Sequence, residues 1–228
     1  MHRLTVLALA AALPLCGAEK GKWVSLFDGK TLKGWAVHSG TASYKAEKGA
    51  ILGTAVLGSP NSFLCTEKEY GDFILEFEVL VDNELNSGVQ VRSQFAKEAL
   101  VFKLEDQGKT IQRKIPADRV YGYQVEIAAG ARGASGNVYD EARRARFLDD
   151  FSNKPAARAA FQNSQWNKYR IVCQGDSLRT WVNGVPAADI KDSLTARGII
   201  GLQVHQIPKD KFKPYQVRFR KLRIKELP

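Results

Sequence analysis

Side chains that could carry acid–base or hydroxyl-binding chemistry recur at alternate positions in several short segments. In "YGYQVEI", residues 121–127, Gln124 and Glu126 are two positions apart within a run of strand-forming residues. Successive side chains of a β-strand point to opposite faces, so the apolar residues take one face and these two polar groups take the other. A carboxylate and an amide on one face can bind hydroxyl groups, and the carboxylate can also move a proton.

Three other segments predict polar residues on the face opposite their apolar stripe. The segments are "SGVQVRS", "LRTWVNGVP" and "RGIIGLQVHQI", and the polar positions are Gln90, Arg92, Thr180, Gln203 and His205. Amides, a guanidinium, a carboxylate and an imidazole are groups that bind sugar hydroxyls or a metal ion. The alternative interpretation is a solvated face or a set of hydrogen-bonded structural groups, since a single histidine or glutamate is more often structural than catalytic.

The elements that must position these residues are strands. In "DFILEFEVLV", residues 72–81, apolar and polar side chains alternate, as expected of a half-buried antiparallel strand. The pair Asn183-Gly184 predicts a two-residue hairpin turn. In "QVRFRKLRIKEL" the apolar phase changes between Phe219 and Leu222, which predicts a β-bulge near Lys221. Many short strands separated by turns favour an all-β, two-layer antiparallel sandwich.

One long insertion interrupts this pattern between Ala129 and Asn163. It shows little alternation, and "DEARRARFLDDF" and "PAARAAF" could each form a short helix. A long insertion in an all-β domain is more often a functional loop than filler. We therefore expect this segment to lie over the site.

The first 18 residues, "MHRLTVLALAAALPLCGA", have the parts of a secretory signal, with a short basic start, an apolar run and small residues that end at Ala18. We expect cleavage after Ala18 and an exported protein, periplasmic or extracellular. The apolar run is too short to span a bilayer as a stable helix. Lipidation of Cys16 is the less favoured alternative, because Leu15 stands where lipoprotein signals prefer a small residue. Residues 19–228 contain no linker or repeat and are expected to form a single domain.

The formal net charge of +10 could indicate a polyanionic partner. The lysines and arginines recur singly between apolar residues, however, as on the solvent face of strands, so we do not expect nucleic-acid binding. Cys65 and Cys173 could form one disulfide in an oxidising compartment, or they could be two buried thiols. The sequence does not separate these alternatives.

The sequence lacks the motifs of several other kinds of catalytic or binding site. The chain has no phosphate-cradling glycine loop, no HExxH or CxxC pair and no GxSxG elbow. A glycosidase that uses two carboxylates is possible, but no spacing selects a pair.

Seven blocks of the sequence occur in an order that resembles the 3-keto-disaccharide hydrolase domain family. The blocks are "LFDGKTLKGW", "NSGVQVR", "YGYQVEI", "VYDEARR", "WNKYRIVCQG", "TWVNGVPAAD" and "GLQVH". The resemblance extends from about residue 23 to the end of the chain. It implies a concanavalin A-like jelly-roll sandwich whose concave sheet carries the site.

The resemblance also implies an activity on sugars oxidised at C3. A ketone at C3 acidifies the C2 proton, so a base can remove this proton and the C1 substituent can leave by elimination, with water added afterwards. Such a site needs a base, stabilisation of the enediolate oxygen, and an acid for the leaving oxygen. A possible divalent metal ion, of unspecified identity, could provide part of that stabilisation.

The residues that we assign to this chemistry come from the strand faces and from the insertion. Glu126 and His205 are the expected base and the metal ligand or proton donor, in either order, and Arg92 could hold the C3 oxygen. The expected substrate-binding residues are Gln90, Gln124, Tyr139, Asp140, Glu141, Arg144, Thr180 and Gln203. The four residues of the insertion could instead form salt bridges or hydrogen bonds between loop and sheet. A carbohydrate-binding module without catalysis is the competing function, because function depends on the site and not on the fold.

Overall fold

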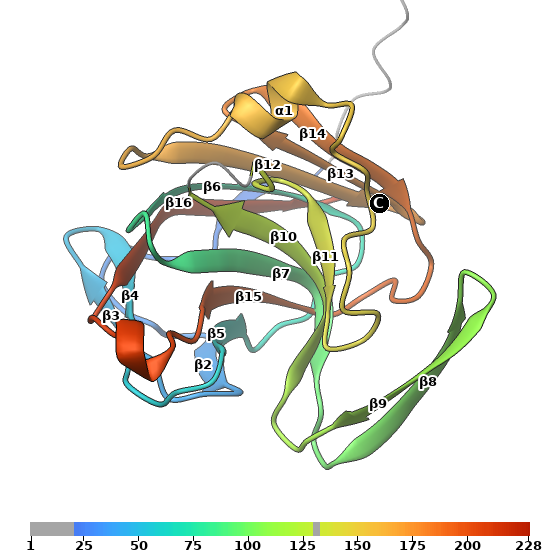
Figure 1. Ribbon diagram of the computed structural model, residues 1–228. Helices are drawn as coiled ribbons and strands as arrows, with labels where there is room; N and C mark the ends of the chain where they lie inside the picture. Colours follow the sequence, from blue (N-terminus) through green and yellow to red (C-terminus); the bar gives the residue numbers. More distant parts are fainter. Residues whose placement is uncertain (1–20, 130–132) are drawn as a thin grey trace, which may run out of the picture.

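Two antiparallel sheets stack face to face in the computed structural model, which describes residues 21–129 and 133–228 (Figure 1). One sheet has eight strands, with the order β14 (Val185–Lys191), β13 (Ser177–Val182), β12 (Asn167–Gln174), β6 (Phe73–Val81), β16 (Gln216–Glu226), β4 (Ala50–Thr54) and β3 (Ser43–Glu47), and with β1 (Trp23–Ser25) paired to β16. The other has six, with the order β11 (Val138–Glu141), β10 (Val120–Ala128), β7 (Asn86–Phe95), β15 (Ile199–Val204), β5 (Ser62–Thr66) and β2 (Trp35–His38). The predicted two-layer antiparallel sandwich is confirmed.

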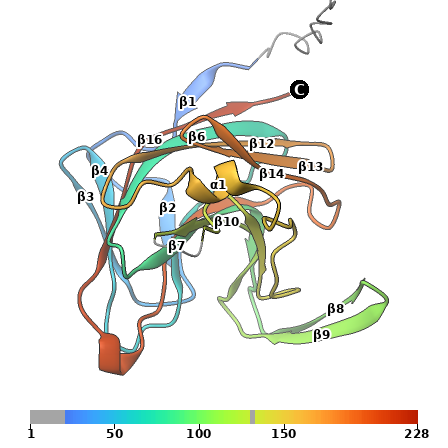
Figure 2. The same cartoon turned by 45° about the horizontal axis from the view of Figure 1, so that its top comes forward.

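Three further elements lie outside these sheets. A separate hairpin of β8 (Leu100–Asp106) and β9 (Lys109–Ile115) extends away from the sandwich, as Figures 1 and 2 both show. The helix α1 (Pro155–Ala159) packs against β14, and the 3₁₀ turn η1 (Lys209–Lys211) follows β15. Among the described residues, no helix has the length and hydropathy needed to cross a bilayer.

The core lies between the two sheets and follows the predicted alternation. Leu75, Phe77 and Val79 of β6 are buried against Val89 and Val91 of β7 and their neighbours in one hydrophobic cluster. This alternation leaves the polar residues of the six-stranded sheet on its other face. The register of that sheet therefore decides which side chains can meet there.

Two local predictions about turns and bulges are confirmed. The register of β16 against β6 shifts between Arg220 and Arg223, and Lys221 takes a positive φ of 53° within that bulge. Asn183 and Gly184, with φ values of 50° and 83°, join β13 to β14. Positive φ at both central residues is what a type I′ hairpin turn requires.

The insertion between Ala129 and Asn163 is more ordered than its sequence predicts. It contains β11, which pairs with β10 as an edge strand, and the short α1 within "PAARAAF". The helix predicted in "DEARRARFLDDF" is wrong, because Ala142 and Ala145 have positive φ values of 57° and 54° that a right-handed helix excludes. The predicted signal sequence, its cleavage and Cys16 lie outside the described residues.

Cys65 and Cys173 are both free and buried, so no disulfide joins them. Burial raises the pKa of the Cys65 thiol well above its ordinary value and that of Cys173 to about 12. Because the thiolate is the reactive form, we expect neither thiol to react with iodoacetamide in the native protein at pH 7, and both to react in denaturant. Mass spectrometry of the two cysteine peptides checks this, and rapid native alkylation of either peptide would contradict the burial described here.

Candidate functional site

A pocket of about 650 Å³ lies on the face of the six-stranded sheet that points away from the core. Its floor comes from β7, β10 and β15, and its walls come from β11, from the insertion and from the segment after β15. The residues that line it are Asn61, Glu84, Asn86, Gln124, Glu126, Tyr139, Glu141, Phe147, Gln203, His205, Gln206, Ile207, Pro208 and Lys211. Six of the predicted site residues are thus brought together, namely Gln124, Glu126, Tyr139, Glu141, Gln203 and His205.

A chain of hydrogen bonds crosses the floor and ends on the carboxylate of Glu126. Ser93 Oγ donates to Gln90 Oε1 at 2.6 Å, and Gln90 Nε2 donates to Gln124 Oε1 at 2.9 Å. Gln124 Nε2 then donates to Glu126 Oε2 at 3.2 Å, while Asn86 Nδ2 donates to Glu126 Oε1 at 2.6 Å. The two amide donors fix the orientation of the carboxylate, one on each oxygen. Gln90 therefore does not line the pocket. It lies beneath the floor and donates to Gln124, which does line it.

Gly88 makes room for this arrangement. It lies directly opposite Glu126 in the β7–β10 pair, and a Cβ added to it would come within 2.6 Å of the Gln124 side chain. The absence of a side chain on Gly88 therefore allows Gln124 to extend across β7 toward Glu126.

The side-chain amide of Gln203 makes no hydrogen bond within the described part of the protein. Its side chain is 0% exposed and lines the pocket, yet neither Nε2 nor Oε1 has a hydrogen-bond partner. An unpaired buried amide is costly, so groups of this kind are normally satisfied by protein, water or a ligand. Gln203 thus offers one donor side and one acceptor to a molecule that enters the pocket.

Tyr139 and Glu141 reach the pocket from β11, the strand that the insertion provides. Burial, and then the nearby carboxylates of Glu141 and Glu126, raise the pKa of the Tyr139 phenol. Its ring meets Phe147 edge-on at 5.3 Å between centroids, and Glu141 forms an ion pair with Arg119. The phenol therefore stays protonated at neutral pH and can act as a donor.

His205 follows β15 at the edge of the pocket. Its Nδ1 lies 2.7 Å from the carbonyl oxygen of Gln206. A carbonyl can only accept, so Nδ1 carries a proton and Nε2 is the nitrogen available for acid–base chemistry or for a metal ion.

Arg92 does not join the site, contrary to the prediction from strand alternation. A bulge at this residue, with φ of 47° and a register shift on both neighbouring strands, breaks the period of two. Its guanidinium is buried and donates to Gly71 O at 2.8 Å, to Gly175 O at 2.7 Å and to Asp72 at 2.6 Å. Arg92 thus links β7 to segments beside the other sheet.

Thr180 is also misplaced by the prediction, because it belongs to β13 in the eight-stranded sheet. It shares the buried phase of Leu178 and Val182, so its side chain faces the interior rather than the polar face. Its hydroxyl donates to Gly136 O at 2.5 Å and accepts from Ala188 N at 2.9 Å.

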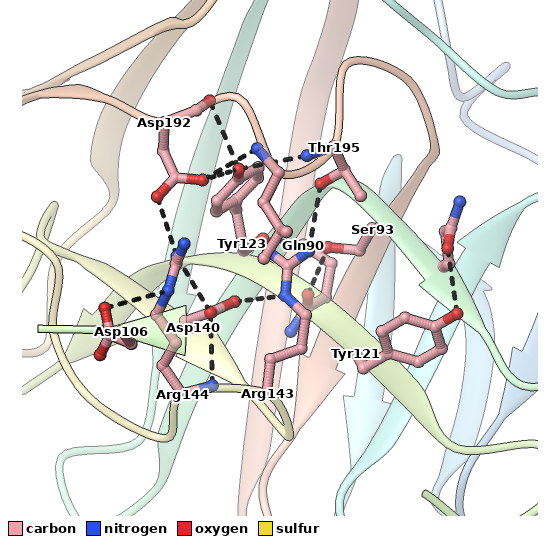
Figure 3. Close-up of polar contacts among 12 residues, drawn as sticks. Gln90, Ser93, Asp106, Tyr121, Tyr123, Asp140, Arg143, Arg144, Asp192 and Thr195 are labelled. Atoms are coloured by element: carbon pink, nitrogen blue, oxygen red, sulfur yellow. Dashed lines mark hydrogen bonds and ion pairs between the residues drawn. The ribbon is translucent and has the colours of Figure 1, made fainter. Parts of the chain in front are cut away.

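Asp140 and Arg144 form a structural network instead of contacting the pocket. Asp140 lies between Tyr139 and Glu141 on β11, so alternation turns it to the opposite side. It pairs with Arg143 at 2.6 Å and with Arg144 at 3.2 Å, and Arg144 also pairs with Asp192 at 2.9 Å (Figure 3). Asp140 and Arg144 thus form the salt bridges between loop and sheet that were the alternative to a role in substrate binding.

The fit of a divalent metal depends on how many ligands converge. Glu126 and His205 line the same pocket, but no group of three or more His, Cys, Asp and Glu side chains within residues 21–129 and 133–228 has the arrangement of a metal site. The described residues therefore do not supply a ready three-ligand set.

Eight lining residues were not predicted from the sequence, namely Asn61, Glu84, Asn86, Phe147, Gln206, Ile207, Pro208 and Lys211. Asn86 could have been found, because it is an even number of positions from Gln90 in "NSGVQVR". The other seven lie outside the strands, where no period predicts the direction of a side chain.

Comparison with solved structures defines the class of fold. A candidate glycosyl hydrolase from Parabacteroides distasonis ATCC 8503 aligns with a TM-score of 0.56 and 17% identity over 92% of this chain and 95% of its own. The carbohydrate-binding module CBM66 from Bacillus subtilis aligns with a TM-score of 0.53 and 15% identity over 85% of this chain and 96% of its own. The protein is thus an all-β, concanavalin A-like jelly-roll sandwich, as predicted.

The sequence places the chain within one family of that class. A family model, the 3-keto-alpha-glucoside-1,2-lyase-like domain, matches residues 22–225, and the chain belongs to this family. No curated protein sequence matched the chain.

Proposed function

We propose that this protein cleaves the glycosidic bond of 3-keto-glucosides or 3-keto-disaccharides in the pocket on the six-stranded sheet. The observation that carries the proposal is the convergence of Glu126, oriented on both oxygens by amides, with the unpartnered Gln203 amide in one pocket. Family membership supports the substrate class. The volume of about 650 Å³ lies within the range of small-molecule sites.

Glu126 acts as the base in the proposed mechanism. Asn86 and Gln124 hold its carboxylate toward the substrate, where it removes the proton from C2. The electron pair of the C2–H bond moves onto the C3 ketone and gives an enediolate. The Gln203 Nε2–H group stabilises that oxygen, which gains charge in the transition state.

Elimination then expels the substituent at C1. His205, in its doubly protonated form, gives the Nε2 proton to the leaving oxygen while Nδ1–H stays on the Gln206 carbonyl. Tyr139 is a second donor within the same pocket. Addition of water to the C1–C2 double bond completes the hydrolysis, and the net reaction consumes one water.

The test compares a 3-keto-disaccharide with its parent sugar, with and without chelator. We expect release of the 3-keto monosaccharide only from the oxidised substrate, because the parent has no acidic C2 proton. Comparable cleavage of both sugars would favour a two-carboxylate glycosidase. Binding without turnover would favour a carbohydrate-binding module. Loss of turnover with chelator, restored by a divalent metal, would add a metal to the site.

The substitution Gly88→Ala tests the arrangement of the pocket floor. The added Cβ displaces the Gln124 side chain, so we expect turnover of the 3-keto substrate to fall about tenfold because Glu126 loses one orienting donor. The thermal midpoint changes little if Gln124 can move aside. The reference variant is Ala129→Gly, one residue after the end of β10 and outside the pocket lining. Unchanged turnover in Gly88→Ala would mean that the position of Gln124 is not needed.

A further inference from the structure

The outward face of the eight-stranded sheet carries ordered rows of charge that the site on the other sheet does not use. Arg170 of β12 lies opposite Glu76 of β6, which lies opposite Arg223 of β16. In the adjacent row, Glu78 lies between Lys168 and Arg220. Residues directly opposite one another share a face, so these rows lie together on the surface away from the core.

The two carboxylates of this face are already engaged by cations. Glu76 binds Arg170 at 2.7 Å and Arg223 at 2.6 Å, and Glu78 binds both Arg220 and Lys221 at 2.7 Å. On this face of β12, β6 and β16 there are thus two carboxylates, Glu76 and Glu78, and six cations, namely Lys168, Arg170, Arg220, Lys221, Arg223 and the largely buried Lys225. The excess is positive, and it accounts for part of the net charge of +10.

Tryptophan rings accompany these cations. The Arg220 guanidinium lies 3.9 Å from the centre of the Trp166 ring, and that of Arg223 lies 4.4 Å from the Trp23 ring. Trp181 lies opposite Arg170 and therefore on the same face. A groove of about 570 Å³ runs here, lined by Trp23, Glu76, Glu78, Lys168, Lys221 and Arg223.

We propose that this outer face binds an acidic polysaccharide, a chain of sugars that carry carboxylate groups. An indole packs against the apolar face of a pyranose ring, while Lys168 offers an exposed ammonium group to its carboxylates. Lys221 pairs with Glu78, but its side chain is 67% exposed, so its remaining N–H groups also face the groove. One groove thus offers an aromatic ring to the sugar ring of the ligand and cations to its carboxylates. The face lies on the sheet opposite the pocket, so it could hold the protein on a polymer while the pocket remains open.

An anionic membrane surface fits this face less well. Among the described residues, Trp23, 36% exposed, is the exposed large apolar side chain on this face, because Val24 lies opposite the buried Ile224 and takes the other face of β1. A protein that lies in a membrane interface presents a wide apolar face to the acyl chains. A single such residue beside many cations fits a hydrated, charged polymer better than a membrane surface.

The test measures binding of the full-length protein to polygalacturonate, with neutral dextran, phosphatidylglycerol vesicles and duplex DNA as competing ligands. We expect binding to polygalacturonate that weakens as salt rises, and much weaker binding to the other three. The double variant Lys168→Gln/Lys221→Asn should weaken binding about tenfold or more, because two exposed charges are lost. Asparagine suits the positive φ of 53° at position 221, so the fold is retained.

The matched control removes two lysines from elsewhere. Lys103→Gln/Lys114→Gln on the exposed face of the β8–β9 hairpin changes the net charge equally and should alter polygalacturonate affinity less than about twofold. Trp23→Leu should weaken polygalacturonate binding but not DNA binding. Three results would overturn the proposal: no binding to polygalacturonate, equal loss in both double variants, or equally tight binding to vesicles or DNA. Cleavage of the 3-keto substrate is expected to be the same in all these variants, which separates this face from the pocket.

Discussion

Glu126→Gln is expected to lower turnover of a 3-keto-disaccharide by about 10² or more, because the substitution removes the proposed base. The amide oxygen of glutamine can still accept from Asn86 or Gln124, so the shape of the pocket floor is kept. The loss should appear in kcat more than in KM, since the carboxylate acts mainly on the C2 proton in the transition state. Steady-state rates at several substrate concentrations measure both.

The control for this variant is Glu67→Gln, which neutralises an exposed glutamate outside the pocket. We expect wild-type turnover from Glu67→Gln and unchanged thermal midpoints in both proteins. If Glu126→Gln retains more than about a tenth of the wild-type rate, another group, His205 foremost, must be the base.

Arg143→Met is expected to destabilise the fold by about 3 kcal/mol or more, because it leaves part of a buried ion pair unmatched. Arg143 and Asp140 are both 0% exposed, and the Arg143 Nε atom donates to Asp140 at 2.6 Å. The guanidinium also lies 4.6 Å from the centre of the Tyr123 ring and donates to Thr195 at 3.3 Å (Figure 3). Denaturant unfolding with a common slope measures the change.

Two reference variants show how much of the lost unfolding free energy is due to the unmatched charge of Asp140. Arg113→Met on the exposed side of β9 should change stability by less than about 0.5 kcal/mol, as surface substitutions usually do. Asp140→Asn/Arg143→Met removes both charges and should recover part of the stability lost in Arg143→Met. A loss below about 1 kcal/mol in the single variant would show that Arg144 alone satisfies Asp140.

Much of the fold could be predicted because alternation is a direct physical signal. The buried phases of β6, β7 and β16 follow from apolar residues at every second position, and the phase change at Lys221 located its bulge. The bulge at Arg92 gave no such signal. Its flanking residues alternate regularly in "SGVQVRS", and only the pairing with β10 and β15 reveals the extra residue.

The site could be predicted where regular strands carry it. Gln124, Glu126 and Gln203 follow from the phases of β10 and β15, and all three line the pocket. Thr180 was misjudged because threonine suits a buried strand position as well as a polar face, and its hydroxyl is satisfied by backbone groups.

The insertion shows the limit of this reasoning. Its four residues Tyr139, Asp140, Glu141 and Arg144 were assigned together, but β11 turns Tyr139 and Glu141 to the pocket and Asp140 away from it, and Arg144 follows the strand and pairs with Asp140. That strand exists because β10 offers it an edge, which is a tertiary effect with no local signal. Phe147 and Lys211 also line the pocket, but they lie in irregular segments that only the tertiary structure positions.

The fate of the hydrogen at C2 tests the proposed mechanism most directly. A 3-keto-disaccharide deuterated at C2 is cleaved in ordinary water, and deuterium in the released 3-keto monosaccharide is measured at early times against an enzyme-free control. Removal of the C2 proton by Glu126, followed by elimination and hydration, predicts a product that has exchanged its deuterium for solvent hydrogen, together with a primary isotope effect if that step limits the rate. Full retention of deuterium at C2 in the product would contradict the mechanism, because direct hydrolysis at C1 leaves that bond intact.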